Sequence, residues 1–180
     1  MTGREEILHL LKKYDRYLLG CHLHPDGDAI GSLLAFGLAL ETAGKKVAMV
    51  LPGGVPEIFR FLEGTEKILP APSFAPEAII ALDCADRERL FLPEEVFAAG
   101  VPLVNIDHHL SNSMFGDFNY VIPEAAATGE IVYDLLTGGG FALDKRIAEA
   151  IYTALATDTG FFRYSNTNGR VFTIVADLVA

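Results

Sequence analysis

The sequence has only two cysteines, and none of its hydrophobic runs reaches the roughly 20 residues that a membrane-spanning helix needs. Two cysteines, Cys21 and Cys84, make no disulfide framework, and the charged residues 1–6 do not form the start of a signal peptide. These absences argue against a secreted disulfide-rich protein and against a membrane protein. We therefore expect a cytoplasmic protein without a membrane partner.

Basic residues are also scarce, with 14 lysines and arginines against 24 aspartates and glutamates and a net charge of −10. Proteins that bind long nucleic acids usually present a basic face, because neutralised phosphates supply most of the affinity. The composition therefore argues against a long duplex as a partner. A phosphorylated substrate would have to be small, with metal ions supplying much of the positive charge.

What the sequence does contain is a high proportion of hydrophobic residues, 51% of 180, which is enough for one sizeable core. Hydrophobic runs predict strands at residues 17–21, 47–51, 67–69, 78–82 and 102–106. Helical spacing and capping residues predict helices at residues 2–13, 29–43, 57–62, 93–99, 124–136, 144–157 and 168–180, the first opened by a capping box from Thr2 to Glu5. This alternation predicts an α/β fold with a mainly parallel central sheet and helices on both faces.

The last predicted helix ends at Leu178-Val179-Ala180 without a usual stop signal. Helices commonly end with a glycine or with basic residues in the last turn, and neither is present here. We therefore expect residues 1–180 to be one domain that is cut short, with a second domain after it.

Four of the five histidines lie in two short clusters with aspartates. The first cluster is the segment 22–28 (HLHPDGD) and the second is Asp107-His108-His109, and each follows a predicted strand. Asp83 directly follows a third strand. The carboxyl ends of parallel strands border one crevice, and first-row divalent metals accept imidazole and carboxylate ligands. The sequence therefore predicts one metal site at the C-terminal ends of the strands.

Each of these residues also has a simpler interpretation. Asp26 or Asp28 can cap the following helix, His22 can be a packed strand residue, and Asp83 can be an ordinary polar strand end. The second cluster is harder to explain in this way, because burying three adjacent titratable residues unpaired is costly. Asp158 lies at a predicted helix end, which disfavours a carboxylate and indicates either solvent exposure or a nearby cation.

The motifs and their order resemble the DHH phosphoesterase superfamily. The resemblance rests on four segments, which are residues 22–32 (HLHPDGDAIGS), Asp83, Asp107-His108-His109 and Asp158-Thr159-Gly160. Four motifs in this order are specific, and they cover nearly the whole chain. The stretches 25–32 and 162–167 are most similar to the branch of nanoRNases and phosphoadenosine-phosphate phosphatases. RecJ-type exonucleases, cyclic-dinucleotide phosphodiesterases and manganese pyrophosphatases are other members of the superfamily.

The resemblance implies a pair of Mn²⁺ ions that activate a bridging water for attack on phosphorus. One ion would be bound by three residues and the other by four, with one aspartate shared: His22, Asp26 and Asp83 for the first, and Asp28, Asp83, His108 and Asp158 for the second. The carboxylates in this set balance the charge of two divalent cations. Without metal they would repel one another, so we expect a chelator to lower the thermal stability.

The resemblance assigns no metal to His109. We expect His109 to contact the scissile phosphate and to assist the leaving oxygen, with Asp107 orienting an imidazole. A purely structural pairing of His109 with Asp107 is the alternative. Arg163 is expected to bind a substrate phosphate, although a solvent-exposed salt bridge explains it equally well. His24 is expected on the loop surface, and Glu130 either near the site or on a solvated helix face.

The function that the resemblance implies is a metal-dependent phosphoesterase acting on short oligonucleotides or on 3′-phosphoadenosine 5′-phosphate. A second, DHH-associated domain would supply the other wall of the cleft, and residues 1–180 do not contain it. Cleavage of cyclic dinucleotides or pyrophosphate is one alternative, and a catalytically silent metal- or nucleotide-binding regulatory module is another. By analogy with the family, a homodimer is a further expectation.

Overall fold

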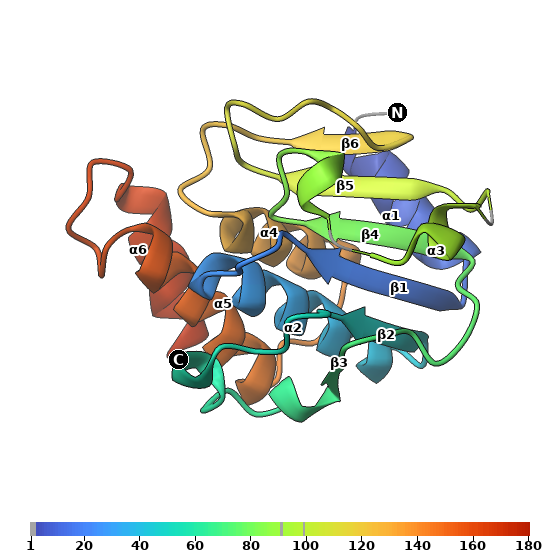
Figure 1. The fold of residues 1–180 in the computed structure, drawn as a ribbon. Coiled ribbons are helices and arrows are strands. Elements are labelled where there is room, and N and C mark those ends of the chain that lie inside the picture. Colours follow the sequence, from blue (N-terminus) through green and yellow to red (C-terminus); the bar gives the residue numbers. More distant parts are fainter. Residues whose placement is uncertain (1–2, 91, 99) are drawn as a thin grey trace.

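The computed structural model describes residues 3–90, 92–98 and 100–180, and its centre is a sheet of six parallel strands. The strands are β1 (Arg16–Cys21), β2 (Lys46–Val50), β3 (Ile68–Leu69), β4 (Ala78–Leu82), β5 (Leu103–Asp107) and β6 (Phe118–Val121). Their order across the sheet is β3-β2-β1-β4-β5-β6, which runs from bottom to top in Figure 1. The predicted parallel sheet is confirmed.

The order of the strands reverses between β1 and β4. From β1 the chain moves outward to β2 and β3, and it then returns to place β4 on the other side of β1. In open parallel sheets, ligands bind outside the carboxyl ends of the strands where the order reverses in this way. The loops after β1 and β4 therefore border the expected site.

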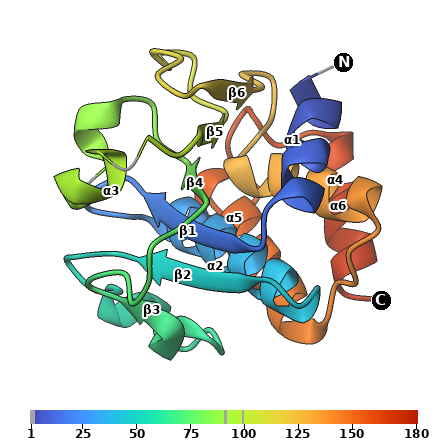
Figure 2. The same cartoon turned by 90° about the vertical axis from the view of Figure 1, so that its right-hand side faces the viewer.

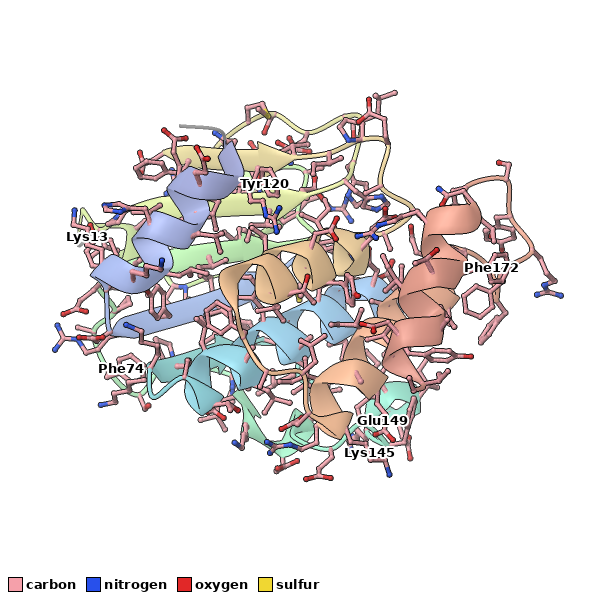
Figure 3. All side chains as sticks on the ribbon, turned by 180° about the vertical axis from the view of Figure 1, so that it is seen from behind. Lys13, Phe74, Tyr120, Lys145, Glu149 and Phe172 are labelled. Carbon is pink, nitrogen blue, oxygen red and sulfur yellow. The ribbon has the colours of Figure 1, made fainter. Side chains whose placement is uncertain are left out.

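The longer helices all lie on one face of the sheet. Figure 3, turned by 180° from Figure 1, shows these helices in front of the strands. The helices α1 (Gly3–Lys13), α2 (Gly27–Thr42) and α4 (Thr128–Gly139) pack on the strands, while α5 (Lys145–Asp158) and α6 (Gly169–Leu178) form an outer layer. Because α2 lies between the sheet and α5, nearly all of its residues are buried, and most of them are hydrophobic. Among the described residues, no helix combines the length and the hydrophobicity needed to cross a membrane.

The other face of the sheet is covered by α3 (Glu94–Ala98) and by the connecting segments around Leu90 and Phe115. They cover a smaller hydrophobic core that includes Leu18 and Ile79. Figure 2 shows the sheet between α3 on the left and the longer helices on the right. The prediction of helices on both faces is therefore confirmed, although the two layers are very unequal.

Two glycines of α2 and one of α4 bring these helices close to α5. A Cβ atom at Gly31 would collide with the backbone oxygen of Ala150 in α5, and one at Gly27 would collide with the Thr157 side chain. A Cβ at Gly129, near the start of α4, would collide with the Ala154 side chain of α5. Only glycine permits backbones to approach this closely. The same approach brings the first turn of α2 next to the ends of α4 and α5.

Two predicted helices and one strand differ in the structure. The helix predicted at residues 124–136 begins only at Thr128, because Ala127 has an extended backbone. The helix predicted at residues 57–62 is a single 3₁₀ turn at Glu57–Phe59, and β6 is an edge strand of four half-buried residues that the hydrophobic pattern does not reveal. Thr2 of the predicted capping box and Ala99 of the predicted helix 93–99 lie outside the described residues.

Candidate metal centre

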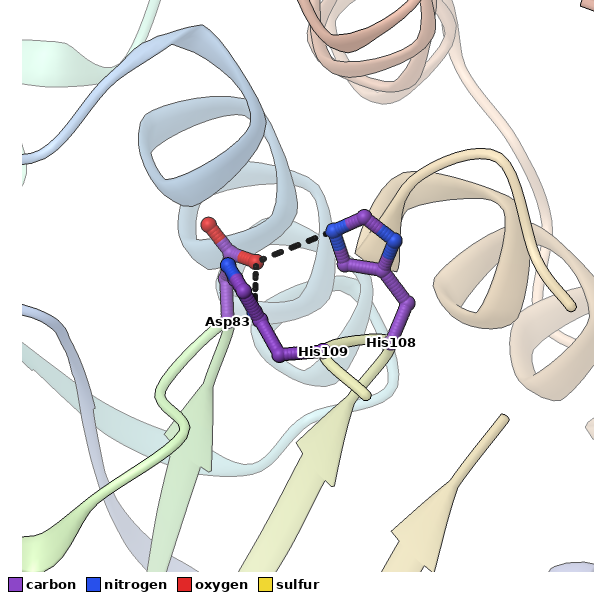
Figure 4. A group of neighbouring side chains, drawn as sticks. All are labelled: Asp83, His108 and His109. Carbon is purple, nitrogen blue, oxygen red and sulfur yellow. Dashed lines mark ion pairs between the residues drawn. The ribbon is translucent and has the colours of Figure 1, made fainter. Parts of the chain in front are cut away.

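All predicted site residues except Arg163 lie near the carboxyl ends of β1, β4 and β5. His22 directly follows β1, Asp83 directly follows β4, and Asp107 is the last residue of β5. Figure 4 shows one carboxylate oxygen of Asp83 paired with both histidines that come after β5, His108 and His109. Because β1, β4 and β5 are neighbours in the sheet, residues from distant parts of the sequence form one cluster.

The first group of candidate ligands is His22, Asp26 and Asp83, with one ligand atom from each within 4.8 Å of the others. His22 Nε2 is 3.4 Å from Asp83 Oδ2 and 3.9 Å from Asp26 Oδ1. Nδ1 of the same ring lies 2.9 Å from the Leu23 carbonyl oxygen, which only accepts hydrogen bonds, so Nδ1 carries the hydrogen and donates this bond. This bond orients the ring so that Nε2 faces the carboxylates and is available to a cation.

Asp26 caps α2 and also faces His22. Its carboxylate accepts a 3.0 Å hydrogen bond from the Ala29 backbone N–H and so caps α2. The same side chain remains exposed and faces His22. The capping interpretation and the ligand interpretation of Asp26 are therefore compatible, and the helix cap holds the carboxylate in place for the second role.

The second group of candidate ligands is Asp28, His108 and Asp158, again with ligand atoms within 4.8 Å of one another. His108 Nε2 is 3.7 Å from Asp28 Oδ2 and 3.5 Å from Asp158 Oδ2. Its Nδ1 lies 3.2 Å from the Ala125 carbonyl oxygen. This contact orients the ring so that Nε2 faces the carboxylates, as the contact with the Leu23 carbonyl oxygen does for His22. Asp158 is the last residue of α5, as predicted, and its side chain is partly buried.

Asp83 belongs to both halves of the cluster. Its Oδ2 faces His22, while its Oδ1 lies 3.9 Å from His108 Nε2 and accepts a 3.0 Å hydrogen bond from the Thr128 hydroxyl. The backbone of Asp83 has a φ of +53°, which is costly for a residue other than glycine. This strained backbone carries a carboxylate whose two oxygens point at different histidines, which is the arrangement that a bridging ligand needs.

Asp28 is held by the N-terminus of α4. Its carboxylate accepts hydrogen bonds from the backbone N–H groups of Thr128, at 2.6 Å, and Gly129, at 2.9 Å, and from the Ser32 hydroxyl at 3.0 Å. A helix N-terminus carries partial positive charge and favours an anion. The remaining free side of Oδ2 faces His108.

The cluster has more negative charge than its own residues neutralise. Burial, together with the charges of Asp83 and Asp158, raises the pKa of Asp28 well above its ordinary value, and burial also raises the pKa of Asp158. Burial alone lowers the pKa of His22, but the hydrogen bond and the charge of Asp83 raise it above the usual value. The raised pKa values mean that these groups bind protons more strongly than usual in the metal-free chain. A bound cation would supply the same positive charge. Imidazole and carboxylate donors in this environment fit first-row divalent cations.

Asp83, His108 and His109 form a third group with ligand atoms within 4.8 Å of one another, but Nδ1 of His109 is paired with Asp107. His109 Nδ1 lies 2.8 Å from Asp107 Oδ1, and this hydrogen bond raises the pKa of His109 to about 9. Asp107 is fully buried, and although burial alone would raise its pKa, the bonds from His109 and Asn112 lower it. His109 Nδ1 is also 3.6 Å from Asp83 Oδ1, so the pair stands next to the cluster.

Arg163 is not brought into the cluster by any contact among the described residues. It is exposed on the loop after α5, where its Nε donates a 2.9 Å hydrogen bond to the Gly160 carbonyl oxygen. His24 is exposed, as expected. Glu130 accepts a hydrogen bond from the Ala126 backbone N–H and supports the start of α4.

Both cysteines are buried and remain free thiols. Burial raises the pKa of Cys84 to about 12 and raises that of Cys21 well above its ordinary value. Thiols that stay protonated are unreactive. The interpretation of both cysteines as packed core residues is therefore favoured.

Thr128 is the contact residue that the sequence pattern does not reveal. It touches both Asp28 and Asp83, through its backbone N–H and its hydroxyl respectively. The predicted helix begins four residues earlier, at residue 124, so it does not predict that the backbone N–H of Thr128 is free to bind a carboxylate. The only signal is the pair Thr128-Gly129, a good N-terminal pair for a helix, after three alanines.

Residues 17–156 match the model of the DHH family, N-terminal domain. The chain belongs to the DHH family. The matched region contains five of the six candidate metal ligands, and Asp158 lies just beyond it. The resemblance inferred from the four motifs is therefore confirmed.

Curated and solved relatives support the same assignment. The chain is 38% identical, over 164 residues, to a protein of Thermus thermophilus named bifunctional oligoribonuclease and PAP phosphatase NrnA, an alignment that covers 89% of this chain and 48% of that protein. A crystal structure of an exopolyphosphatase-related protein from Bacteroides fragilis is 28% identical, with a TM-score of 0.90, covering 98% of this chain and 56% of that one.

The exonuclease RecJ, solved with manganese bound, shares the fold. The TM-score is 0.61 at 15% identity, and the match covers 99% of this chain and 48% of RecJ. The chain thus spans about half the length of the relatives and solved structures it matches.

Proposed function

We propose that this chain is the catalytic domain of a Mn²⁺-dependent phosphoesterase that hydrolyses short oligonucleotides or 3′-phosphoadenosine 5′-phosphate. The observation that carries this proposal is Asp83, whose two oxygens face two different groups of imidazole and carboxylate donors. The names of the oligoribonuclease relatives support the substrate class. The high negative charge of the chain favours a short substrate over a long duplex.

Two divalent cations are proposed at this centre. His22, Asp26 and Asp83 would hold one, and Asp28, Asp83, His108 and Asp158 would hold the other. When bound, such a pair supplies Lewis acidity toward phosphoryl oxygens and lowers the pKa of water. The chain's own contribution is to fix the donors, through the carbonyl oxygens of Leu23 and Ala125 and the N-terminus of α4.

His109 is proposed to contact the scissile phosphate and to donate a proton to the leaving oxygen. Asp107 accepts the hydrogen bond from Nδ1, so Nε2 is the nitrogen directed away from this pair. A pKa of about 9 keeps both ring nitrogens of His109 protonated, and the ring positively charged, at neutral pH in the metal-free chain. A protonated imidazole is both an attractive partner for phosphate and a source of the proton that the departing oxygen requires.

Arg163 is proposed to bind a phosphate of the substrate away from the scissile bond. It is exposed, and its Nε–H is used by Gly160, which leaves the terminal N–H groups of the guanidinium to face outward. The loop that carries Arg163 directly follows Asp158, the last residue of α5. A second, DHH-associated domain beyond residue 180 is proposed to form the facing wall of the cleft.

Hydrolysis of RNAs of two to five nucleotides and of 3′-phosphoadenosine 5′-phosphate tests the proposal. Each assay is run with Mn²⁺ and with chelator, on this chain and on the full-length protein. The matched variants are Asp83→Ala and, as a control in the same region, His24→Asn. Turnover that requires Mn²⁺, persists in His24→Asn and disappears in Asp83→Ala supports the proposal.

A different result selects one of the alternatives. Turnover of cyclic dinucleotides or pyrophosphate alone shifts the assignment to another DHH phosphohydrolase. Two bound Mn²⁺ ions per chain without hydrolysis of any of these substrates by the full-length protein overturns the proposal in favour of a regulatory module.

A further inference from the structure

The amide side chain of Asn112 connects the segment that follows β5 to several neighbouring groups. Its Nδ2 lies 2.6 Å from Asp107 Oδ2, 2.8 Å from Asn105 Oδ1 and 3.3 Å from the Cys84 carbonyl oxygen. Its Oδ1 accepts a 2.7 Å hydrogen bond from the Met114 backbone N–H. An amide nitrogen carries two hydrogens, so the two shortest contacts, to Asp107 and Asn105, are the full hydrogen bonds.

The orientation of this amide is determined by its partners. A carboxylate only accepts hydrogen bonds and a backbone N–H only donates them. The group next to Asp107 must therefore be the amide nitrogen, and the group next to Met114 must be the amide oxygen. Reversing the amide would place two acceptors together on one side and two donors on the other.

Asp107 is thereby bound at both of its oxygens. Oδ2 accepts from Asn112, and Oδ1 is 2.8 Å from His109 Nδ1. Because Asp107 is fully buried, no solvent competes for these two positions. Asn112 thus fixes the rotation of the carboxylate, and the carboxylate fixes the ring of His109, so Nε2 is held away from Asp107.

The other end of the amide is anchored in the protein interior. Asn105 is fully buried in β5, and its Nδ2 donates a 3.0 Å hydrogen bond to the Cys84 carbonyl oxygen. Cys84 directly follows Asp83, whose backbone has the strained φ of +53°. The amide of Asn112 therefore joins the loop after β4, which carries Asp83, to the loop after β5, which carries His109.

We propose that Asn112 is a positioning residue for His109 and acts through Asp107. The inference rests on the proposed function, because it needs His109 to contact the substrate. Removal of Asn112 takes away the bond at Oδ2 and leaves Asp107 only its bonds from His109 and from the His108 backbone N–H, so the carboxylate and the ring of His109 are held less firmly. The expected consequence falls on kcat, because the Cys84 carbonyl oxygen keeps its bond from Asn105 and Asp83 keeps its bond from Thr128 when Asn112 is replaced.

The kinetic test compares Asn112→Leu, which has similar volume but no donor, with Ser113→Ala. Ser113 lies in the same segment and bonds the Ala85 carbonyl oxygen through its hydroxyl, but it does not touch Asp107. In the full-length protein with Mn²⁺, we expect kcat to fall roughly 10- to 100-fold in Asn112→Leu, with KM nearly unchanged. Ser113→Ala should retain the kcat of the wild type.

A double-mutant cycle separates positioning from general loop stability. If Asn112 acts only through His109, then adding Asn112→Leu to His109→Ala should cost no more than about twofold in kcat. A loop-stabilising role would instead lower kcat by the same factor in both backgrounds. Equal factors in the two backgrounds, or an unchanged kcat in Asn112→Leu, overturn the proposal.

A measurement without turnover keeps the inference separate from the proposed function. In the metal-free chain at one fixed pH, the ¹⁵N shifts of the His109 ring report the bond between Nδ1 and Asp107. These shifts should move in Asn112→Leu and stay in place in Ser113→Ala, with both variants checked for folding by thermal melting. Unchanged His109 shifts in folded Asn112→Leu refute the positioning role. Failure of the wild type to hydrolyse any substrate refutes the proposed function instead.

Discussion

Asp28 accepts a 2.6 Å hydrogen bond from the backbone N–H of Thr128, a residue 100 positions further along the chain. The carboxylate also bonds Gly129 N–H, so it caps α4 from outside that helix. This single contact connects α2, α4 and the metal cluster. It also means that Asp28 has a structural role in addition to its proposed role as a ligand.

Asp28 and Asp158 should therefore respond differently to truncation. We expect Asp28→Ala to lower the free energy of unfolding of the metal-free chain by about 1–3 kcal/mol, because buried N–H groups lose their acceptor. The pKa of both carboxyl groups is raised, so the difference between them is that Asp158 accepts no hydrogen bond from a backbone N–H among the described contacts, and Asp158→Ala should not destabilise the metal-free chain. Urea unfolding in chelator measures both. Equal losses in the two variants would contradict the capping role.

Metal binding should stabilise the chain. At a free Mn²⁺ concentration of 100 times Kd, binding to the folded state adds about 2.7 kcal/mol per site. For a chain of this size, each occupied site therefore raises Tm by roughly 5–10 °C. Thermal melting with Mn²⁺ and with chelator measures the difference. Asp83→Ala removes a donor from both groups, so Mn²⁺ should raise the Tm of this variant only slightly. A rise as large as in the wild type would argue against a shared ligand.

The metal-free chain should lose stability as the pH rises from 7 to 10. The hydrogen bond with Asp107 raises the pKa of His109 from 6.5 to about 9, so folding favours the protonated ring. The stabilisation is complete below pH 6.5 and is lost as the pH rises through about 9. His109→Gln should flatten the dependence of Tm on pH in this window. Parallel curves for the two proteins would show that another group is responsible.

Gly31 should be intolerant of any side chain. A Cβ at this position meets the backbone oxygen of Ala150, which cannot move without shifting α5. We expect Gly31→Ala to cost about 1–3 kcal/mol in the free energy of unfolding, as overpacked cores do. Gly53→Ala is the matched control, because nothing lies within 4 Å of a Cβ there. Chemical denaturation of both variants measures the contrast, and comparable stabilities would contradict the close packing of α2 on α5.

Arg163→Ala should weaken substrate binding without affecting the metals. The loss of a charge-assisted bond to phosphate is worth about 1.5–3 kcal/mol, so KM should rise roughly 10- to 100-fold while kcat changes little. Arg170→Ala is the control, because Arg170 is exposed on the neighbouring α6 and pairs with Asp134. An unchanged KM in Arg163→Ala would leave Arg163 as an ordinary surface residue.

Local patterns in the sequence determined the fold class and most of the candidate ligands. Strands such as 78–82 are hydrophobic throughout because both faces of the sheet are covered, and the first polar residue after each strand marks its carboxyl end. Parallel strands bring those ends together, so His22, Asp83 and Asp107 could be placed in one cluster without coordinates. The order of the motifs then indicated the family.

Only the tertiary structure decided how these side chains are supported. An aspartate that starts a helix resembles any other N-cap, and nothing near residue 28 in the sequence reveals a partner in α4. The strained backbone of Asp83, the hydroxyl of Thr128 and the amide of Asn112 likewise depend on contacts between loops that are distant in the sequence. Hydrophobic periodicity encodes burial and chain direction, whereas the choice of hydrogen-bond partner is made only when the layers pack.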